Sequence, residues 1–166
     1  MATAPDRLLD VPQVAIRAMT EADVPAVIQV ERASYQFPWS EGIFRDCLRV
    51  GYVCRVVMRD SELVGYGVMS AAACEAHILN LCVREADRCR GVGRLLLEHL
   101  LGRAAAAGMA EAYLEVRPSN TAAIRLYQSL GFEPIGVRRG YYQAVGGRED
   151  AAVLKLALRG RRARLS

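Results

Sequence analysis

The chain is predicted to fold as an α/β sandwich, in which helices pack on a mixed sheet. Apolar runs of strand length alternate with segments of helical spacing along most of its length. Two successive strand patterns, at residues 133–139 and 151–158, indicate a terminal hairpin rather than another strand–helix unit. The 166 residues, 52% of them hydrophobic, suffice for one compact domain with a buried core. We expect this domain at residues 13–158, between flexible termini at 1–12 and 159–166.

The first part of the domain is predicted to contain a short strand and a helix. The strand is expected at residues 13–17. Thr20 and Asp23 have the spacing of a capping box, with aspartate in place of glutamate, so the helix should begin there. Pro25 suits its first turn, and apolar residues with helical spacing continue the helix to about Glu31.

An aromatic loop at residues 35–40 separates this helix from a second one. Ser40 can cap the second helix, whose apolar positions continue to Leu48. A hairpin follows, with strands at residues 52–58 and 63–72 joined by a short polar turn. These strands are expected to form the first half of the sheet.

Residues 80–97 are the most informative stretch of the chain, because a buried strand leads there through a charged, glycine-bearing turn into a helix. The strand is expected at residues 75–83 and the helix at 91–107, ending at Gly108. In this order, the unpaired backbone N–H groups at the start of the helix point at one spot, where the helix dipole favours negative charge.

The residues of the turn favour the same interpretation. Gly91 and Gly93 have no Cβ, so a ligand can approach the backbone closely. Arg88, Arg90 and Arg94 add positive charge around the turn. The turn is therefore predicted to bind phosphate, as part of a pyrophosphate.

Two other kinds of phosphate-binding loop do not fit this turn. A Walker loop requires Gly-Lys-Ser/Thr, but Arg94 and Leu95 follow Gly93. A dinucleotide-binding fingerprint requires a third glycine where Leu96 stands. The remaining pattern, Arg-x-x-Gly-x-Gly at residues 88–93, is weak by itself, and an ordinary glycine-rich turn is the alternative.

Composition and charge argue against several classes of protein. A net charge of +4 is modest and favours an anionic ligand over extended nucleic-acid binding. Five cysteines without a Cys-x-x-Cys pair are interpreted as reduced residues of a cytoplasmic protein. His77 and His99 form no metal-binding pattern. We expect neither a signal peptide nor a membrane span, because no apolar run has the required length.

Two residues further along the chain are candidates for proton transfer. Glu115 lies in a strand expected at residues 113–116, where alternation places it on the face opposite Leu114 and Val116. It is either a solvent-facing carboxylate or a general base. Tyr127 lies about two turns into the next helix and is either a core residue or a proton donor, since a phenol with a pKa near ~10 is protonated at neutral pH.

The helix that carries Tyr127 is expected to begin at Ser119 or Asn120 and to end at Gly131. Beyond it, residues 141–150 are expected to form an exposed loop between the last two strands of the sheet.

The chain resembles the GNAT superfamily of acetyl-CoA-dependent N-acetyltransferases in a series of motifs: RCRGVG at residues 88–93, then LLLEHLL, then LEVRPSNTAAIRLYQSLGF. The segments FPWSE, RRGYYQ and GRED make it most similar, within that superfamily, to the ribosomal-protein alanine N-acetyltransferases. The resemblance covers residues 13–158. It implies a three-layer α/β/α sandwich around a mixed, mostly antiparallel sheet whose central strands splay apart.

The resemblance also implies where acetyl-CoA binds as the cosubstrate. Pantetheine is expected to enter the wedge between the splayed strands and to pair with the backbone of the first of them, while the pyrophosphate lies on the turn that follows. Cys89 stands where close relatives often carry a basic or polar residue, which predicts some loss of cofactor affinity. The residues expected to contact acetyl-CoA are Leu81, Cys82, Val83, Arg88, Cys89, Arg90, Gly91, Val92, Gly93, Arg94 and Asn120.

By the same resemblance, Glu115 is the proton acceptor and Tyr127 the proton donor for direct attack of an amine on the thioester, without a metal. An acyl intermediate on Cys82 or Cys89 is not favoured, because the sequence places no base that would activate either thiol.

The acceptor that the resemblance implies is the N-terminal α-amino group of a protein, namely the N-terminal alanine of a small-subunit ribosomal protein. Residues 35–40, together with Tyr141 and Tyr142, are candidates for the acceptor groove. A lysine side chain or a small amine is an alternative acceptor. Two further alternatives are a non-catalytic acyl-CoA-binding module and a nucleic-acid binder that uses the basic tail. Nucleic acid and membrane are not expected as partners.

Overall fold

The structure, a computed structural model, describes residues 13–159 and contains seven strands and four α-helices in that range. Single-turn 3-10 helices at Glu21–Asp23 and Glu85–Asp87 precede α1 and α3. The expected terminal segments, including the basic tail beyond Arg159, lie outside the described residues. The elements in chain order are β1 (Ala15–Ala18), α1 (Val24–Ser34), α2 (Glu41–Arg49), β2 (Val53–Arg59), β3 (Glu62–Ala72), β4 (Glu75–Val83), α3 (Val92–Ala106), β5 (Glu111–Val116), α4 (Thr121–Ser129), β6 (Glu133–Ala144) and β7 (Gly147–Ala157).

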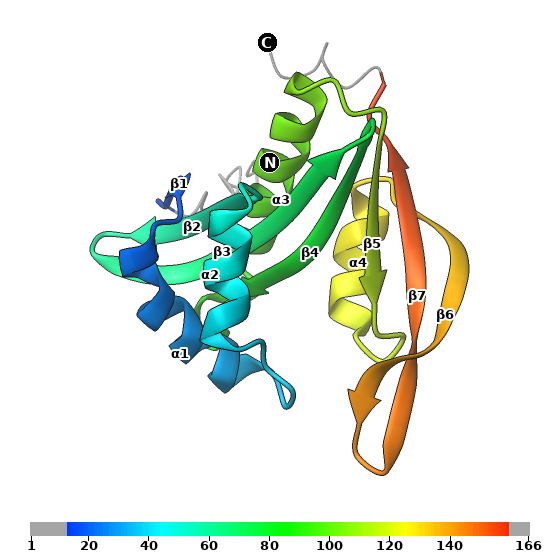
Figure 1. Cartoon of the computed structure of the whole chain (residues 1–166), viewed down its shortest axis with the longest axis horizontal. Helices are drawn as coiled ribbons and strands as arrows, with labels where there is room; N and C mark the ends of the chain where they lie inside the picture. The colour runs from blue at the N-terminus through cyan, green and yellow to red at the C-terminus, as the bar shows by residue number, and fades with distance from the viewer. Residues whose placement is uncertain (1–12, 160–166) are drawn as a thin grey trace, which may run out of the picture.

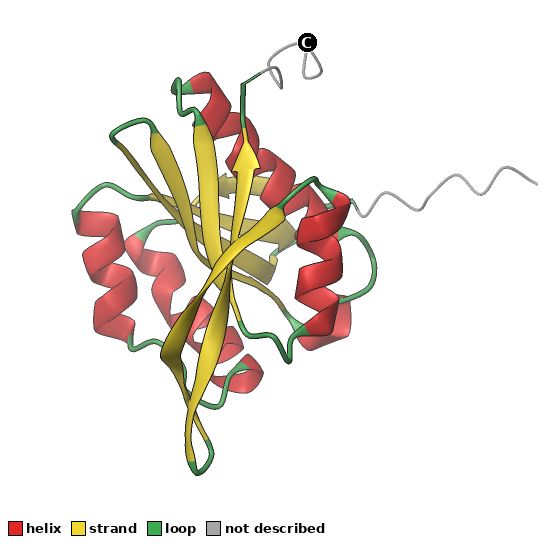
Figure 2. Ribbon diagram, turned by 90° about the vertical axis from the view of Figure 1, so that its right-hand side faces the viewer, coloured by secondary structure: helices red, strands yellow, loops and turns green. Residues whose placement is uncertain are grey.

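The strands form one sheet in the order β1-β2-β3-β4-β5-β7-β6. Neighbouring strands are antiparallel except β4 and β5, which run parallel. Helices α1 and α2 lie on one face of this sheet, and α3 and α4 lie on the other (Figures 1 and 2). The predicted sandwich of helices around a mixed, mostly antiparallel sheet is therefore confirmed.

The two parallel strands are paired along only part of their length. Their register runs from Glu75 opposite Glu111 to Ile78 opposite Leu114 and stops there. Beyond this point β4 continues to Val83 and the two strands diverge (Figure 1). The wedge that opens between them is the splay that the sequence resemblance implied.

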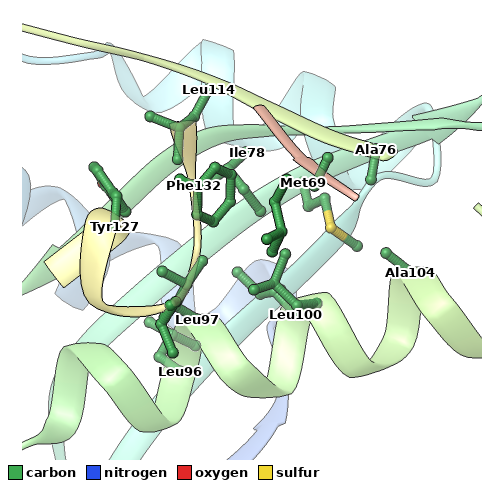
Figure 3. Close-up of a cluster of buried hydrophobic side chains, with 14 of the residues drawn as sticks. Met69, Ala76, Ile78, Leu96, Leu97, Leu100, Ala104, Leu114, Tyr127 and Phe132 are labelled. Carbon is green, nitrogen blue, oxygen red and sulfur yellow. The ribbon is translucent and has the colours of Figure 1, made fainter. Parts of the chain in front are cut away.

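Each face of the sheet has its own apolar core. In the larger one, Leu96, Leu97 and Leu100 of α3 pack with Ile78 and Leu114 of the parallel strands (Figure 3). The second core joins α1 and α2 to β2 and β3. Ile78 and Leu114 are also the last residues that pair β4 with β5. The larger core therefore fixes the point from which the wedge opens.

Capping residues and glycines mark most of the helix ends, as the sequence predicted. Thr20 and Asp23 form the expected capping box, and the Ser40 side chain accepts a hydrogen bond of 3.3 Å from the backbone N–H of Ile43. Gly108 and Gly131 follow α3 and α4 with φ of +83° and +100°, a conformation that favours glycine.

The expectation of an exposed loop at residues 141–150 is wrong. Strand β6 continues to Ala144 and β7 begins at Gly147, so only a tight turn separates them. The register shifts between Arg138 and Tyr142, which lets β6 bend near Gly140 before its pairing with β7 resumes. The hairpin consequently extends as a twisted ribbon beyond the rest of the sheet (Figure 2).

Candidate functional site

A cleft with a volume of about 560 Å³ opens where β4 and β5 diverge. Its walls come from these two strands, the end of α1 with the loop after it, the start of α4 and the tip of the β6–β7 hairpin. Glu115 and Tyr127, the two predicted proton-transfer residues, both line the cleft, and so do Leu81 and Asn120. The fold therefore brings both candidates for chemistry to one concave surface with two of the eleven predicted cosubstrate residues. Cys82, Val83 and the turn at residues 88–94 lie outside its lining.

The turn between β4 and α3 presents backbone N–H groups that have no partner in the protein. The first backbone hydrogen bond of α3 is the one from Leu95 to the Gly91 carbonyl oxygen, and no side chain caps the helix. Within residues 13–159, the N–H groups of Val92, Gly93 and Arg94 therefore donate to no protein atom. Together with the helix dipole, they form a site suited to a phosphate group.

The two glycines of this turn serve different purposes. Gly91 has a φ of +82°, in the left-handed region, so its backbone conformation itself favours glycine. Gly93 lies inside α3, and a Cβ there would meet only Leu126 at 3.5 Å and Val83 at 3.7 Å, which are ordinary contacts. Neither backbone conformation nor protein packing requires a glycine at Gly93. The absence of a side chain there is therefore best explained by the close approach of a ligand.

The arginines of the turn are mostly occupied by protein partners. The Nε of Arg88 donates to the Val83 carbonyl oxygen at 2.9 Å, and Arg94 contacts Glu98 and the Ser129 hydroxyl. Among the described residues, Arg90 has no hydrogen bond or ion pair and is exposed. The predicted positive charge is present, but Arg88 and Arg94 also hold the turn in place.

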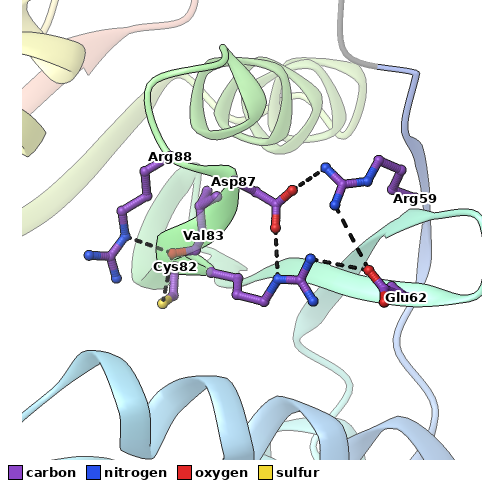
Figure 4. Close-up of polar contacts among 7 residues, drawn as sticks. Arg59, Glu62, Cys82, Val83, Asp87 and Arg88 are labelled. Atoms are coloured by element: carbon purple, nitrogen blue, oxygen red, sulfur yellow. Dashed lines mark hydrogen bonds and ion pairs between the residues drawn. The ribbon is translucent and has the colours of Figure 1, made fainter.

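The turn is held in place by a buried carboxylate, Asp87, which was not predicted from the sequence. The Asp87 side chain is 1% exposed and accepts hydrogen bonds from Arg59 and, at 2.7 Å, from Arg84 (Figure 4). Burial favours a raised pKa of this carboxyl group, but the two arginines outweigh it and the pKa is lowered. Asp87 therefore stays ionised and ties the turn to the β2–β3 hairpin.

At the end of β4, the carbonyl oxygens of two alternate residues accept hydrogen bonds from side chains. The Leu81 carbonyl oxygen accepts a hydrogen bond from the Tyr35 hydroxyl at 3.2 Å, and the Val83 carbonyl oxygen accepts the bond from Arg88 already described. Cys82 instead buries its side chain in the core under α1 and α2. Of the three residues expected to pair with pantetheine, Leu81 lines the cleft, whereas Cys82 and Val83 do not.

Glu115 lies on β5 between buried Leu114 and Val116, on the opposite face, as alternation predicts. Its carboxylate is engaged on both oxygens: Oε2 contacts Nε2 of His77, and Oε1 lies 3.3 Å from Nε of Arg138. Burial tends to raise the pKa of this carboxyl group, but the hydrogen bond and charge of His77 and the charge of Arg138 lower it on balance. Glu115 is therefore ionised at neutral pH.

Tyr127 lies on the buried face of α4, with its ring centroid 5.9 Å from that of Phe132. It belongs to the larger core and also lines the cleft. Burial raises the pKa of its phenol to about 12. The hydroxyl therefore keeps its proton at neutral pH, as a proton donor must.

Asn120, rather than Ser119, caps α4. Its side-chain oxygen accepts a hydrogen bond of 3.2 Å from the backbone N–H of Ala123. This bond uses the oxygen of the amide, so the NH₂ group is the part of Asn120 that can donate to a ligand in the cleft.

The β6–β7 hairpin is attached to the cleft by a polar clamp, which we define as Arg117, Ser119 and Glu149. Arg117 donates to Glu149 at 3.1 Å and to the Gln143 carbonyl oxygen at 2.8 Å. The Ser119 hydroxyl donates to the same carboxylate at 2.7 Å. The guanidinium of Arg117 also lies 4.4 Å from the centroid of the Tyr142 ring. The clamp keeps the hairpin tip over the cleft.

The loop at residues 35–40 forms the other wall of the cleft and is held by Glu31. The Glu31 carboxylate, only 2% exposed, accepts hydrogen bonds from the backbone N–H of Trp39, the Tyr66 hydroxyl and the Asn80 amide. From helical spacing alone, Glu31 was predicted merely to continue α1. A carboxylate on the apolar face of a helix was the signal that could have identified it.

The structure offers little to a metal ion or to thiol chemistry. No group of three or more potential metal ligands occurs within residues 13–159. All five cysteines are free, and neither Cys82 nor Cys89 lines the cleft. No helix in the described range has the length and apolarity needed to cross a membrane.

The arrangement combines three chemical capacities. The start of α3 can hold a phosphate, the cleft offers an ionised carboxylate at Glu115, and Tyr127 offers a protonated phenol. Residues whose environments push their pKa values apart in this way are suited to accepting one proton and donating another.

Comparison with known proteins gives consistent results. The model of the Acetyltransferase (GNAT) family matches residues 16–132. The [ribosomal protein bS18]-alanine N-acetyltransferase of Escherichia coli (strain K12) is 36% identical over 143 residues, which cover 86% of this chain and 97% of that protein. A crystal structure of the ribosomal-protein-S18-alanine N-acetyltransferase from Escherichia coli has a TM-score of 0.82 at 35% identity and covers 87% of this chain and 94% of its own. Arabidopsis thaliana NAA60 in complex with acetyl-CoA has a TM-score of 0.80 at 20% identity, covers 89% of this chain and 99% of its own, and is similar in fold.

Proposed function

Because the chain belongs to the acetyltransferase (GNAT) family, whose members use acetyl-CoA, we propose that it acetylates the N-terminal α-amino group of a protein. The proposed acceptor is the N-terminal alanine of a small-subunit ribosomal protein. The observation that carries this assignment is the similarity, over most of both chains, to bacterial enzymes named for the alanine of ribosomal protein bS18.

The proposed acetyl-CoA site follows the wedge. The diphosphate is assigned to the unpaired N–H groups of Val92, Gly93 and Arg94, with exposed Arg90 beside it. Pantetheine is assigned to the edge of β4 beyond its pairing with β5, an edge that begins at Leu79 and includes Leu81 in the lining of the cleft. The amide of Asn120 is assigned to the same cosubstrate from the opposite wall.

Glu115 is proposed to accept the proton of the acceptor amine. An α-amino group has a pKa near ~8, so much of it is protonated at neutral pH and must lose a proton before it attacks. The lowered pKa of Glu115 keeps the carboxylate in its basic form but makes it a weak base. The proton is therefore passed on, through a water molecule, to solvent.

Tyr127 is proposed to protonate the leaving thiolate of coenzyme A. Its raised pKa keeps the hydroxyl protonated until the thiolate forms. The oxyanion that develops on the thioester carbonyl is assigned to a backbone N–H of β4 near Cys82 or Val83. Holding both reactants in one cleft supplies much of the remaining rate.

The proposed acceptor groove lies between the loop at residues 35–40 and the tip of the β6–β7 hairpin. Both segments line the cleft, through Phe37 and Tyr142 among others, whereas Tyr141 is exposed outside the lining. These aromatic groups offer contact area to the first residues of a peptide.

The experiment that tests this function incubates the protein and acetyl-CoA with a peptide panel and detects acetylation by intact mass. The panel contains peptides that begin with Ala, Ser or Met, the same peptides with blocked N-termini, and peptides with internal lysines. We expect label on the free N-terminal alanine and none on blocked peptides.

Other outcomes of the panel would redirect the assignment. Label on lysine alone would overturn the N-terminal assignment while leaving an acetyltransferase. Binding of acetyl-CoA without transfer to any amine would indicate a binding module and overturn the proposed enzyme.

A further inference from the structure

Glu31 stands out among the carboxylates of the cleft because its contacts join three separate segments. Its Oε1 accepts a hydrogen bond of 3.0 Å from the backbone N–H of Trp39, in the loop at residues 35–40. Its Oε2 accepts from the Tyr66 hydroxyl on β3 and, at 3.1 Å, from the Asn80 amide on β4. One buried side chain therefore fastens the loop to the two strands beside it.

The partners of Glu31 are all neutral. No arginine, lysine or histidine within residues 13–159 forms an ion pair with it, in contrast to Glu115, which has His77 and Arg138. A buried carboxylate depends on its hydrogen bonds when no cation compensates it. Its hydrogen bonds from three donors therefore stabilise it, and the backbone of Trp39 is the donor that belongs to the loop.

Two further contacts hold the loop at residues 35–40. The Trp39 ring packs on Phe44 at a centroid distance of 5.3 Å, and the Tyr35 hydroxyl bonds to the Leu81 carbonyl oxygen. Phe37 is 40% exposed. Glu31 instead bonds to the backbone of the loop, at Trp39 near its end.

We propose that Glu31 is a positioning residue for the acceptor: it holds the loop at residues 35–40 in the shape that forms one wall of the acceptor groove. This inference rests on the proposed function, which assigns that groove to the acceptor peptide. The bond from Glu31 to Trp39 acts on the acceptor side of the cleft.

The cosubstrate side has its own support. The turn before α3 is held by Asp87 with Arg59 and Arg84, which do not contact Glu31. Changing Glu31 should therefore weaken acceptor binding while acetyl-CoA binding persists. If Glu31 only stabilised the fold, its loss would weaken acceptor binding and acetyl-CoA binding together. Comparing the change in acceptor KM with the change in acetyl-CoA affinity therefore distinguishes a positioning role from a purely structural one.

Trp39 provides a direct readout, since it is the single tryptophan of the chain. Its emission reports the position of the loop without any acceptor. The test compares Glu31→Ala, which removes both carboxylate oxygens, with Tyr66→Phe, which removes one hydrogen bond from Oε2 and leaves the bond to Trp39 in place. Glu31→Gln is the conservative variant, because it keeps one oxygen that can accept from Trp39.

For Glu31→Ala we expect the KM for the acceptor peptide to rise by about tenfold or more, as the loss of a hydrogen bond to a charged group predicts. We expect the dissociation constant of acetyl-CoA to change by less than about twofold, because the turn assigned to its diphosphate is held by Asp87 and does not contact Glu31. The Trp39 emission should move to longer wavelength. Glu31→Gln should show smaller effects in the same direction, and Tyr66→Phe should leave acceptor KM and emission close to wild type.

Three results would overturn the inference: an unchanged acceptor KM in the Glu31 variants, an equal loss of acetyl-CoA affinity, or the same acceptor defect in Tyr66→Phe. If Glu31→Ala does not fold, Glu31→Gln against Tyr66→Phe provides the comparison. If wild type modifies lysine instead of an N-terminus, the proposed function fails, while the emission shift and the KM for the lysine peptide still test the role of Glu31.

Discussion

The surroundings of Glu115 and Tyr127 shift the pKa values of the two side chains in opposite directions. His77 and Arg138 lower the pKa of the Glu115 carboxyl group against the effect of burial, whereas burial alone raises the pKa of the Tyr127 phenol to about 12. At neutral pH one group is ready to accept a proton and the other is ready to donate one. Both line the same cleft although they come from a strand and a helix.

The first prediction concerns these two residues. Glu115→Gln and Tyr127→Phe should each lower turnover by about 10²–10⁴-fold, the usual contribution of a positioned acid or base. Acetyl-CoA should still bind, because the turn before α3 is unchanged. Steady-state kinetics together with calorimetric titration of acetyl-CoA measure the two effects separately.

A matched control is available on β5. Tyr113 lies two residues before Glu115 and bonds to Glu111, but it does not line the cleft. Tyr113→Phe should therefore leave turnover unchanged. Undiminished turnover in Tyr127→Phe would remove that tyrosine from the mechanism, and an equal loss in Tyr113→Phe would point to disturbance of the sheet.

At the scale of elements, the start of α3 depends on a glycine that the protein itself does not require. Replacing Gly93 by alanine adds a Cβ that meets only ordinary contacts. Since alanine is favoured over glycine inside a helix by roughly 0.5–1 kcal/mol, stability should stay equal or increase. Affinity for acetyl-CoA should fall, because the new methyl group occupies space next to the phosphate site.

Thermal unfolding and equilibrium titration of Gly93→Ala measure these opposite changes. Gly91→Ala is the contrasting variant: its φ of +82° penalises any Cβ, so stability itself should fall, by about 1 kcal/mol. Undisturbed affinity in Gly93→Ala would show that the diphosphate binds elsewhere.

A second prediction at this scale concerns the cap at the start of α1. Arg17, and to a lesser degree Thr20, lower the pKa of Asp23 to about 2 against the effect of burial. Because the folded-state pKa lies below the unfolded value, this contribution to stability is present above about pH 4 and is lost as the pH falls toward 2. Asp23→Asn should cost about 1 kcal/mol at pH 7, after allowance for solvent screening.

Denaturant unfolding of Asp23→Asn at pH 7 and in steps down to pH 2.5 measures this contribution. The variant should lose less stability than wild type between about pH 4 and pH 2.5. Asp46→Asn is the control, because its ion pair with Arg49 is between two well-exposed side chains and such pairs contribute little. A parallel pH dependence in wild type and Asp23→Asn would contradict the assignment.

These elements also show what the sequence could and could not predict. Caps such as Ser40 and stops such as Gly108 act through neighbouring residues, so a local pattern was enough to predict them. Glu31 and Asp87 have partners far along the chain, and nothing in their local spacing indicates those partners. The hairpin itself was predicted, but its tip was mistaken for a loop, because a bulge interrupts the ladder between Arg138 and Tyr142 before the pairing resumes.

At the scale of the whole molecule, the cleft is a consequence of strand pairing that ends early. β4 and β5 pair for four residues and are then kept apart, with one core on each side of the sheet. No local pattern encodes this divergence, and in the sequence it was implied only by the family resemblance. A ligand in the wedge would bridge the two halves of the sheet, between which backbone pairing is confined to residues 75–78 of β4 and 111–114 of β5.

The last prediction follows from this bridging position. Acetyl-CoA should bind the folded protein and not the unfolded chain, so at 100 times its dissociation constant it should stabilise the fold by about 2.7 kcal/mol. For a chain of this size, that corresponds to a rise in Tm of roughly 5–10 °C, measured by calorimetry. Gly93→Ala should show a smaller rise at the same concentration, because its phosphate site is narrowed. Pantetheine, which lacks the diphosphate, should stabilise the wild type less than acetyl-CoA does. An equal rise with pantetheine would mean that the N–H groups at the start of α3 contribute nothing to binding, since they are the groups assigned to the diphosphate.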